Sequence, residues 1–560
     1  MYDLYGALIG NLSNYLYTYI LIILLVAGGI YFTVRTKFVQ FRYLKESLRV
    51  VLAPSEDDKA ISSFQALMVS TASRVGTGNI AGVSTAICLG GLGSLFWMWL
   101  TALLGMSTAF VEGTLAQIYK RRSDDGGCYG GPSYYIDQAT GKHWLGILFA
   151  VFMILTYMVG FNLVASFNIA DAFRVIPAYS QNENLAKWII GGVLAVLFFV
   201  CISGGGKQIA GITEKIVPFM GFFYIAVAVF VIVTHITLLP GVFAEIFRNA
   251  FDVKAIFGGF TGSAVMLGIK RGLFSNEAGV GAAACAAGSA GVSHPVKQGL
   301  VQVLSVFLDT CMICTATAML LLCSGVEPDA DMAGMAYVQA AMNSTLGKFG
   351  VVFITVSLFL FAFTTLLGNF YYAETGLAYL CGMTPSNGAK WCMRIVAAVV
   401  VCVGATMKLG IVWDTADVLM GFMALINVPV IVILLKPVLR CLEDYTEQKK
   451  AGKNPVFKAE HIVEAAGYNT GAEGATTIPV FGVDATDAAK ELIAAGKMTG
   501  TVKQDAEGMA VAIASVVKAA GEGTAMADAI AATAATNAEM YSIADGIANK
   551  LFVAYAAYTK

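Results

Sequence analysis

Charged residues are scarce in this chain of 560 residues. Asp, Glu, Lys and Arg make up 13% of it, whereas hydrophobic residues make up 57% and the mean hydropathy is +0.71. A soluble globular protein carries about 25% charged residues, so the composition excludes an ordinary soluble enzyme and predicts an integral membrane protein with many spans. The net charge of −1, without a basic patch interleaved with aromatic residues, gives no support for nucleic-acid binding.

Patterns typical of metal sites and catalytic sites are also missing from the sequence. The four histidines stand in no metal-ligand spacing, and the 11 cysteines are scattered mostly through apolar runs. The lone CxxC pair, Cys311 and Cys314, lies in the middle of an apolar run, which favours packed thiols over a metal or redox site. No nucleophile–base pair or metal cluster indicates an enzyme. We therefore predict a protein that is not an enzyme and has no cofactor.

Long apolar runs are what the chain has in abundance. Counting runs of about 18 residues or more, the length that crosses a bilayer, gives one preliminary span followed by two sets of five. The predicted spans are 15–33; then 63–89, 94–119, 144–173, 188–203 and 216–237; and then 257–282, 296–323, 349–371, 391–407 and 412–435. Basic residues follow the first span from Arg35 to Arg49, and basic loops stay in the cytoplasm. The pattern predicts a multi-pass protein of the plasma (cell inner) membrane, with the N-terminus outside and the C-terminus in the cytoplasm.

Glycines interrupt the first span of each set of five. Residues 75–79 read Val-Gly-Thr-Gly-Asn, and residues 258–262 read Gly-Gly-Phe-Thr-Gly. Glycine alone is ambiguous, because it also lets helices pack closely. Paired interrupted spans at corresponding positions instead indicate an inverted-repeat transporter whose broken helices bind the substrate. Lys270 and Arg271 come late in the second broken span, which predicts that its second half reaches the cytoplasmic side.

Several motifs resemble one transporter family. Residues 74–83, RVGTGNIAGV, and residues 271–279, RGLFSNEAG, are similar to the most distinctive motifs of the alanine/glycine:cation symporters. Further runs similar to that family are 294–300, 309–310 and 314–317. The resemblance covers residues 1–440 and implies an all-α, leucine-transporter-like fold with 11 transmembrane helices, in which a five-plus-five inverted repeat follows one extra N-terminal helix. It also implies uptake of alanine or glycine, coupled to sodium or protons, by alternating access.

An amino acid presents a carboxylate and an ammonium group to such a site. The amides of Gly76, Thr77 and Gly78 are expected at the N-terminal end of a half-helix, where the positive dipole suits the carboxylate. Asn79 either completes this carboxylate site or orients the loop. The ammonium is expected to meet the backbone carbonyls that the interruption frees around Thr261 and Gly262.

A sodium site is implied by the resemblance to this fold. Its expected ligands are the carbonyls of Ala72 and Val75, at the end of the first half-helix, with the Phe361 carbonyl and the hydroxyls of Thr364 and Thr365. The alternative is that the two threonines only bond back to the preceding turn of their own helix, as threonines in membrane helices commonly do.

Ionisable residues inside predicted spans are costly and are functional hypotheses by default. Arg74, Glu112 and Asp309 are such residues, and their partners are left open by the sequence. Glu277 is predicted to pair with Arg271, either as part of a cytoplasmic gate or as a purely structural ion pair.

Three positions depart from the family pattern. The family often has Gln and Asn where this chain has Ala165 and Phe167, and a tryptophan is usual where it has Asn369. Both segments lie near the substrate in this fold, so Phe167 is expected to line the site. The alternatives that stay open are another small neutral amino acid as substrate and protons as the coupling ion. A channel is a further alternative, against which the paired broken helices argue.

The composition changes after Arg440, where residues 450–560 become rich in Ala, Gly and charge without a span. We predict a transmembrane symporter domain over 1–440 and a small soluble cytoplasmic α/β appendage over 441–560. The elements predicted in the appendage are a buried strand and turn at 478–484 and amphipathic helices at 485–496 and 505–520. The appendage resembles part of the C-terminal half of a periplasmic galactose/glucose-binding protein but is too short for both lobes.

Overall fold

The structure is a computed structural model. It describes residues 2–53, 60–122, 128–251, 263–382 and 385–457, together with five short strands between residues 481 and 558. The chain forms two compact units, Met1–Phe457 and Lys458–Lys560, and each is described by itself.

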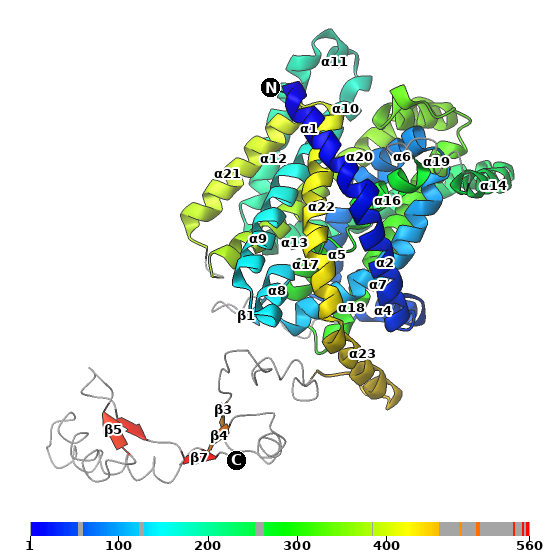
Figure 1. Ribbon diagram of the computed structural model, residues 1–560. Helices are drawn as coiled ribbons and strands as arrows, with labels where there is room; N and C mark the ends of the chain where they lie inside the picture. The colour runs from blue at the N-terminus through cyan, green and yellow to red at the C-terminus, as the bar shows by residue number, and fades with distance from the viewer. Residues whose placement is uncertain are drawn as a thin grey trace. The chain divides into compact units, whose positions relative to one another are not determined.

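The first unit is a helical bundle in which nine helices, among the described residues, are long and apolar enough to cross a membrane. Figure 1 shows the bundle with α1 beginning at one end and α23 at the other. The spanning elements are α1–η1–α2 (Tyr2–Tyr15, Leu16–Leu21, Ile22–Arg35), α7 (Ser94–Ile118), α9–η3–α10–η4 (His143–Ile154, Leu155–Phe161, Asn162–Ala172, Phe173–Val175), α12 (Glu183–Ile202), α13 (Gly205–Thr234), α18–η6–α19 (Pro295–Val306, Phe307–Cys314, Thr315–Leu322), α20 (Met335–Leu380), α21 (Asn387–Gly404) and α22 (Leu409–Ile433). These nine coincide with the nine predicted spans that have no glycine interruption.

Shorter elements fill the connections. They are α3 (Val39–Arg42), α4 (Leu44–Val51), β1 (Arg121–Arg122), β2 (Cys128–Tyr129), α8 (Pro132–Thr140), α11 (Pro177–Gln181), η5 (Ile236–Leu238), α14 (Leu239–Ala250), η7 (Ala330–Met332) and α23 (Leu435–Lys450). β1 and β2 form an antiparallel pair. α20 is interrupted at Gly347, whose φ of 60° and ψ of −148° are not helical, so its first part is a separate helix ahead of the spanning part.

The predicted span 63–89 is broken, as expected. α5 (Ser63–Arg74) begins with a capping box in which the Ser62 and Gln65 side chains bond to each other's backbone amides, and it ends at Val75, whose ψ is 87°. η2 (Gly78–Gly82) and α6 (Val83–Gly90) then continue the span. The break therefore falls within the predicted residues 75–79.

The second broken span also has a break among the described residues. The glycines at 258–262 lie outside the described residues, but a break is found further along, between α16 (Ala264–Asn276) and α17 (Ala283–Ser289). Positive φ angles of 52° at Glu277, 97° at Gly279 and 91° at Gly281 end one helix before the next begins. The pattern Gly279-Val280-Gly281 thus mirrors Gly76-Thr77-Gly78 in the first broken span.

The two broken spans run in opposite directions. Ile61, just before α5, forms a parallel bridge with Ala290, just after α17, so these half-helices meet at one end of the bundle. At the other end, a side chain at Gly90, the last residue of α6, would lie 3.0 Å from the Leu267 side chain of α16. An antiparallel pair of broken helices is the arrangement expected of an inverted repeat.

Lys270 and Arg271 belong to the first half of the second broken span. Both lie on α16, the half of the second broken span that shares an end with α6, and not on α17. Lys270 Nζ donates to Ser13 Oγ of α1 at 2.8 Å, which places this part of α16 against the N-terminal helix.

The C-terminal end of the first unit folds back on the bundle. The Phe457 amide donates to the Ser293 carbonyl at 2.7 Å, and Ser293 Oγ donates to the Pro455 carbonyl at 2.8 Å. His294, fully buried, lies 3.1 Å through Nε2 from Asp444 Oδ2 of α23. Burial lowers the pKa of the His294 imidazole to about 4, although Asp444 opposes that shift, so the ring is neutral at pH 7. Residues 454–457 therefore belong to the bundle and not to the tail.

We expect truncation after Phe457 to leave membrane insertion and uptake intact, because the second compact unit begins at Lys458. Truncation after Lys450 should instead lower stability by roughly 1–3 kcal/mol, since it removes the hydrogen bonds of Phe457 and Pro455 with Ser293. Thermal unfolding and uptake of the two truncated chains, at equal membrane expression, distinguish the cases. Loss of uptake in the 1–457 chain would show that the second unit takes part in transport.

The second unit contains short paired strands. β3 (Phe481–Val483) pairs in parallel with β4 (Gly500–Lys503), which pairs antiparallel with β7 (Ala556–Tyr558). β5 (Tyr541–Ile543) and β6 (Leu551–Val553) form a separate antiparallel pair. β3 falls within the strand predicted at 478–484, whereas the helices predicted at 485–496 and 505–520 lie outside the described residues.

Candidate functional site

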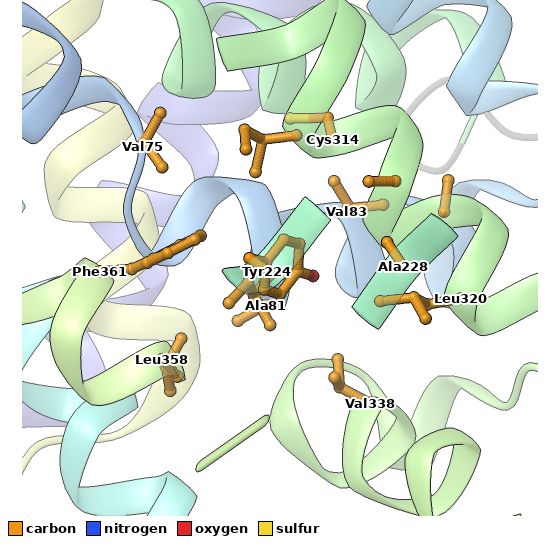
Figure 2. Packing of buried hydrophobic residues seen from close by; sticks show 14 of the residues in the cluster. Val75, Ala81, Val83, Tyr224, Ala228, Cys314, Leu320, Val338, Leu358 and Phe361 are labelled. Carbon is orange, nitrogen blue, oxygen red and sulfur yellow. The ribbon is translucent and has the colours of Figure 1, made fainter. Parts of the chain in front are cut away.

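The end of α5 lies against the middle of α20. A side chain at Gly368 of α20 would lie 2.7 Å from the Ser73 backbone nitrogen, so the two backbones touch and only glycine fits. Figure 2 shows Val75 and Phe361 on these neighbouring elements, as members of the apolar cluster that also contains Tyr224 and Leu358. This contact brings the end of the first half-helix to the predicted threonines.

The predicted cation ligands gather at this contact. Thr365 Oγ1 lies 3.1 Å from the Ala72 carbonyl, across the interface, and 2.9 Å from the Phe361 carbonyl of its own helix. Thr364 Oγ1 lies 3.0 Å from the Phe361 carbonyl and 3.1 Å from the Leu360 carbonyl. Thr365 thus links the two helices, whereas the carbonyls that accept from Thr364 belong to its own helix.

Val75 completes the predicted set by position. It is the residue at which α5 ends, and it is 2% exposed. A side chain at the next residue, Gly76, would overlap Thr365 Oγ1 and would lie 3.1 Å from Thr365 Cβ. The Thr365 hydroxyl therefore sits directly against the break, surrounded by backbone carbonyl groups that suit a small hard cation.

Asn79 holds the first break in shape. Its Oδ1 accepts from the Gly76 amide at 2.8 Å, while its Nδ2 donates to Asp309 Oδ1 at 2.6 Å and to Ser275 Oγ at 3.2 Å. Both ends of this amide side chain are engaged, so its geometry is that of the loop-orienting alternative. The Gly76 amide is likewise already bonded.

Asp309 joins the two breaks. It lies on η6, is fully buried, and accepts through Oδ2 from Ser275 Oγ of α16 at 2.7 Å and from Thr310 Oγ1 at 2.6 Å. Through Asn79 it also reaches the first break. A side chain at Gly78 would lie 3.0 Å from the Phe274 ring, so the turn after the first break packs directly on the end of α16.

Ser73 makes a second connection between the breaks. Its hydroxyl lies 3.1 Å from Glu277 Oε1 and 2.9 Å from Asn369 Oδ1. Asn369 Nδ2 in turn donates to Asn162 Oδ1 of α10 at 3.0 Å. Asn369, where the sequence departs from the expected tryptophan, thus forms part of a hydrogen-bonded path from α5 to α10.

The predicted pairing of Glu277 with Arg271 is not observed. Glu277 is the left-handed residue that ends α16, and its Oε1 meets Ser73. Arg271 pairs through Nη2 with Asp417 of α22, and Lys270 Nζ lies 2.9 Å from the same carboxylate. The ion pair therefore joins α16 to α22 at the end of the bundle that α16 shares with α6.

The remaining buried charges have partners that the sequence left open. Arg74 Nη1 donates to Gln302 Oε1 at 3.1 Å. Glu112 Oε1 accepts from Asn427 Nδ2 of α22 at 2.6 Å. All four groups are buried.

The other predicted substrate residues are placed only in part. Phe167, 7% exposed, and Ala165, fully buried, lie on α10. Thr261 and Gly262 lie outside the described residues. Ser275, Asn162 and Asp417 were not predicted as site residues. Ser275 stands within the distinctive 271–279 motif, whereas the signal for Asn162 and Asp417 was a polar side chain within an apolar run.

The chain is similar to known proteins over most of its length. A family model described as the sodium:alanine symporter family matches residues 2–459. The chain is 43% identical over 464 residues to "Amino-acid carrier protein AlsT" of Bacillus subtilis, covering 82% of this chain and 97% of that protein. It is 44% identical over 452 residues to "Probable sodium/glutamine symporter GlnT" of the same organism, covering 80% and 92%.

Two more distant proteins are also similar. "Sodium/alanine symporter AgcS" of Methanococcus maripaludis is 36% identical over 453 residues, covering 79% of this chain and 98% of that protein. Among solved structures, MhsT in complex with L-phenylalanine aligns with a TM-score of 0.49 at 14% identity, covering 73% of this chain and 92% of that chain.

Proposed function

Because the chain belongs to the sodium:alanine symporter family, we propose that it is a secondary-active symporter that imports alanine, glycine or another small neutral amino acid with sodium. The observation that carries this proposal is the meeting of two antiparallel broken helices at Asp309, reached through Asn79 and Ser275. Two breaks held together by side chains give a site that can be opened from either end of the bundle. The protein works as a transporter, not as an enzyme.

The substrate site is proposed to lie at the two breaks. The carboxylate meets the start of η2 at Thr77 and Gly78, while Asn79 and Gly76 hold that turn in shape. Phe167 of α10 lines the site. Backbone carbonyls of the second broken span, from Thr261 and Gly262, meet the ammonium.

The sodium site is proposed at the contact between α5 and α20. Carbonyl groups of Ala72, Val75 and Phe361 and the hydroxyls of Thr364 and Thr365 supply its oxygen atoms. The position of Thr365 Oγ1 between the Ala72 and Phe361 carbonyls supports this assignment. In the absence of a cation, the hydroxyl hydrogen satisfies one of these carbonyls; a bound cation would displace it.

The finer topology is also a proposal. Counting the two broken spans with the nine continuous ones gives 11 spans, arranged as one preliminary helix and a five-plus-five inverted repeat. The protein is proposed to lie in the plasma (cell inner) membrane, with its N-terminus outside the cell and its C-terminus in the cytoplasm. The symporter domain, predicted over 1–440, is proposed to extend to Phe457 with the first compact unit. The part of the predicted 441–560 appendage that follows is proposed to be cytoplasmic, and its resemblance is to part of a periplasmic-binding-protein lobe.

Uptake into proteoliposomes tests the function. We expect radiolabelled alanine to accumulate above equilibrium only with an inward sodium gradient, and glutamine in the same assay defines the substrate range. Thr365→Ala should raise the half-saturating sodium concentration by about tenfold or more, which corresponds to about 1.4 kcal/mol. Accumulation driven equally well by protons, or equilibration without accumulation, would contradict sodium symport and favour proton coupling or a channel, respectively.

A further inference from the structure

A polar cavity of about 400 Å³ lies beside the bridge that joins the α5 and α17 ends of the broken helices. Ile61 and Ser289 from that bridge region line it, together with the start of α13, the start of α21 and the face of α20 that carries Tyr371 and Glu374. Glu374 follows Thr365 on α20 by nine residues, which is about 14 Å along an α-helix. The cavity therefore lies at the end of the bundle where α5 and α17 meet, about 14 Å along α20 from the proposed cation site.

The cavity carries charges of both signs. Lys207, Lys390 and Arg394 contribute three cations and Glu374 contributes one carboxylate. Arg394 is only 8% exposed, and its Nε has no hydrogen-bond partner among the described residues. A buried guanidinium with an unused donor is costly unless a ligand satisfies it.

Arg394 and Glu374 approach one point in the cavity from two sides. A methyl group placed on Gly205 would lie 3.7 Å from Arg394 Nη2 and 3.7 Å from Glu374 Oε1. Gly205 has a φ of 72°, a conformation that favours glycine, so no side chain occupies that point. The two charges face a shared space of the size of a small ligand, without forming an ion pair with each other in the described part of the chain.

We propose that this cavity is a second binding site for a small amino-acid zwitterion. The ligand carboxylate bonds to Arg394, with Lys390 and Lys207 nearby, and the ligand ammonium meets Glu374. Opposite charges around one point match a zwitterion, because a simple anion would leave Glu374 without a cationic partner on the ligand and the three cations repel a simple amine. The proposal rests on the proposed transport function: the site holds the amino acid between the broken helices and the solution at this end of the bundle.

Saturation-transfer NMR of the purified full-length protein in sodium-free choline chloride tests this site, because it detects weak binding without transport. We expect a clear signal from alanine and much weaker signals from propionate and ethylamine, which carry only one of the two charges. Arg394→Gln and Glu374→Gln should each weaken sodium-free alanine binding by roughly tenfold, the effect of losing one charge-assisted contact. Arg394→Lys should restore part of the binding, since it keeps the charge.

Matched controls separate the site from surface charge and from misfolding. Lys215→Gln and Glu245→Gln change exposed residues that do not line the cavity, and both should bind alanine as the wild type does. Thermal unfolding of every variant identifies any that fail to fold, and the two cavity variants test the site independently.

Several outcomes would overturn the proposal. Unchanged sodium-free alanine binding in folded Arg394→Gln and Glu374→Gln variants would show that the cavity holds no zwitterion. Equal binding of propionate, with displacement by inorganic phosphate, would identify an anion site instead. Sodium-driven uptake is measured on the same preparations: absent uptake with intact sodium-free binding would contradict the transport function but not this site.

Discussion

Replacing Asp417 with asparagine is expected to lower the free energy of unfolding by about 3–5 kcal/mol, the usual cost of removing one partner from a buried charge pair. Asp417 is fully buried and is shared by Arg271 and by Lys270, whose Nζ lies 2.9 Å from it. The Arg271 guanidinium also lies 4.3 Å from the ring centroid of Trp413. Asparagine keeps the size of the side chain but leaves two buried cations without their carboxylate.

Thermal or denaturant unfolding of the detergent-solubilised protein measures this effect. Asp414→Asn is the matched control, because Asp414 lies 3.5 Å from Lys270 Nζ and its side chain is 29% exposed. Partly exposed pairs contribute about 1 kcal/mol or less, so this control should lose little stability. Similar unfolding of the two variants would mean that Asp417 does not hold the charge cluster together.

The charge cluster around Asp417 also lies where it can restrain the movement of a broken helix. Asp417 connects α16, one half of a broken helix, to α22, a continuous helix. A movement of α16 that opens the α6 end of the bundle must separate these charges or carry α22 along. We therefore expect the ion pair to oppose any movement of α16 away from α22.

The continuous spans could be predicted from the sequence because each needs only one local property, a long apolar run. The first break could also be predicted, since Gly76 and Gly78 flank a single residue within such a run and the surrounding motif resembles a known family. The Ala72 and Phe361 carbonyls and the Thr365 hydroxyl could be placed together only through that resemblance. No local sequence pattern relates α5 to a helix almost three hundred residues later.

The break expected at residues 258–262 lies outside the described residues and stays a prediction. The break found at Gly279 and Gly281 could not be predicted from these glycines alone, because glycine in a membrane helix also serves close helix packing. The partners of long-range ion pairs could not be predicted from the sequence either. Arg271 and Glu277 are close in sequence, but Glu277 turns away into a left-handed conformation, and Arg271 finds its carboxylate 146 residues away on α22.

Gly76→Ala is expected to reduce sodium-driven alanine uptake by roughly a hundredfold or more, the size of loss that a misplacement of about 1 Å causes at a reacting or binding centre. The added methyl would overlap Thr365 Oγ1 and lie 3.1 Å from Thr365 Cβ, so the end of α5 and α20 must move apart. Uptake with a full sodium titration, at equal protein per vesicle, measures the loss.

Two further variants identify the cause. Gly82→Ala is the control in the same broken span, because its methyl would meet the Trp413 ring at an ordinary 3.5 Å; it should transport normally. The double variant Gly76→Ala/Thr365→Ala removes the overlapping hydroxyl, so thermal stability should recover in part. Its sodium dependence should stay impaired, because the hydroxyl that bridges Ala72 and Phe361 is gone. Normal sodium titration in Gly76→Ala would contradict the proposed site, since the cation would then bind away from this contact.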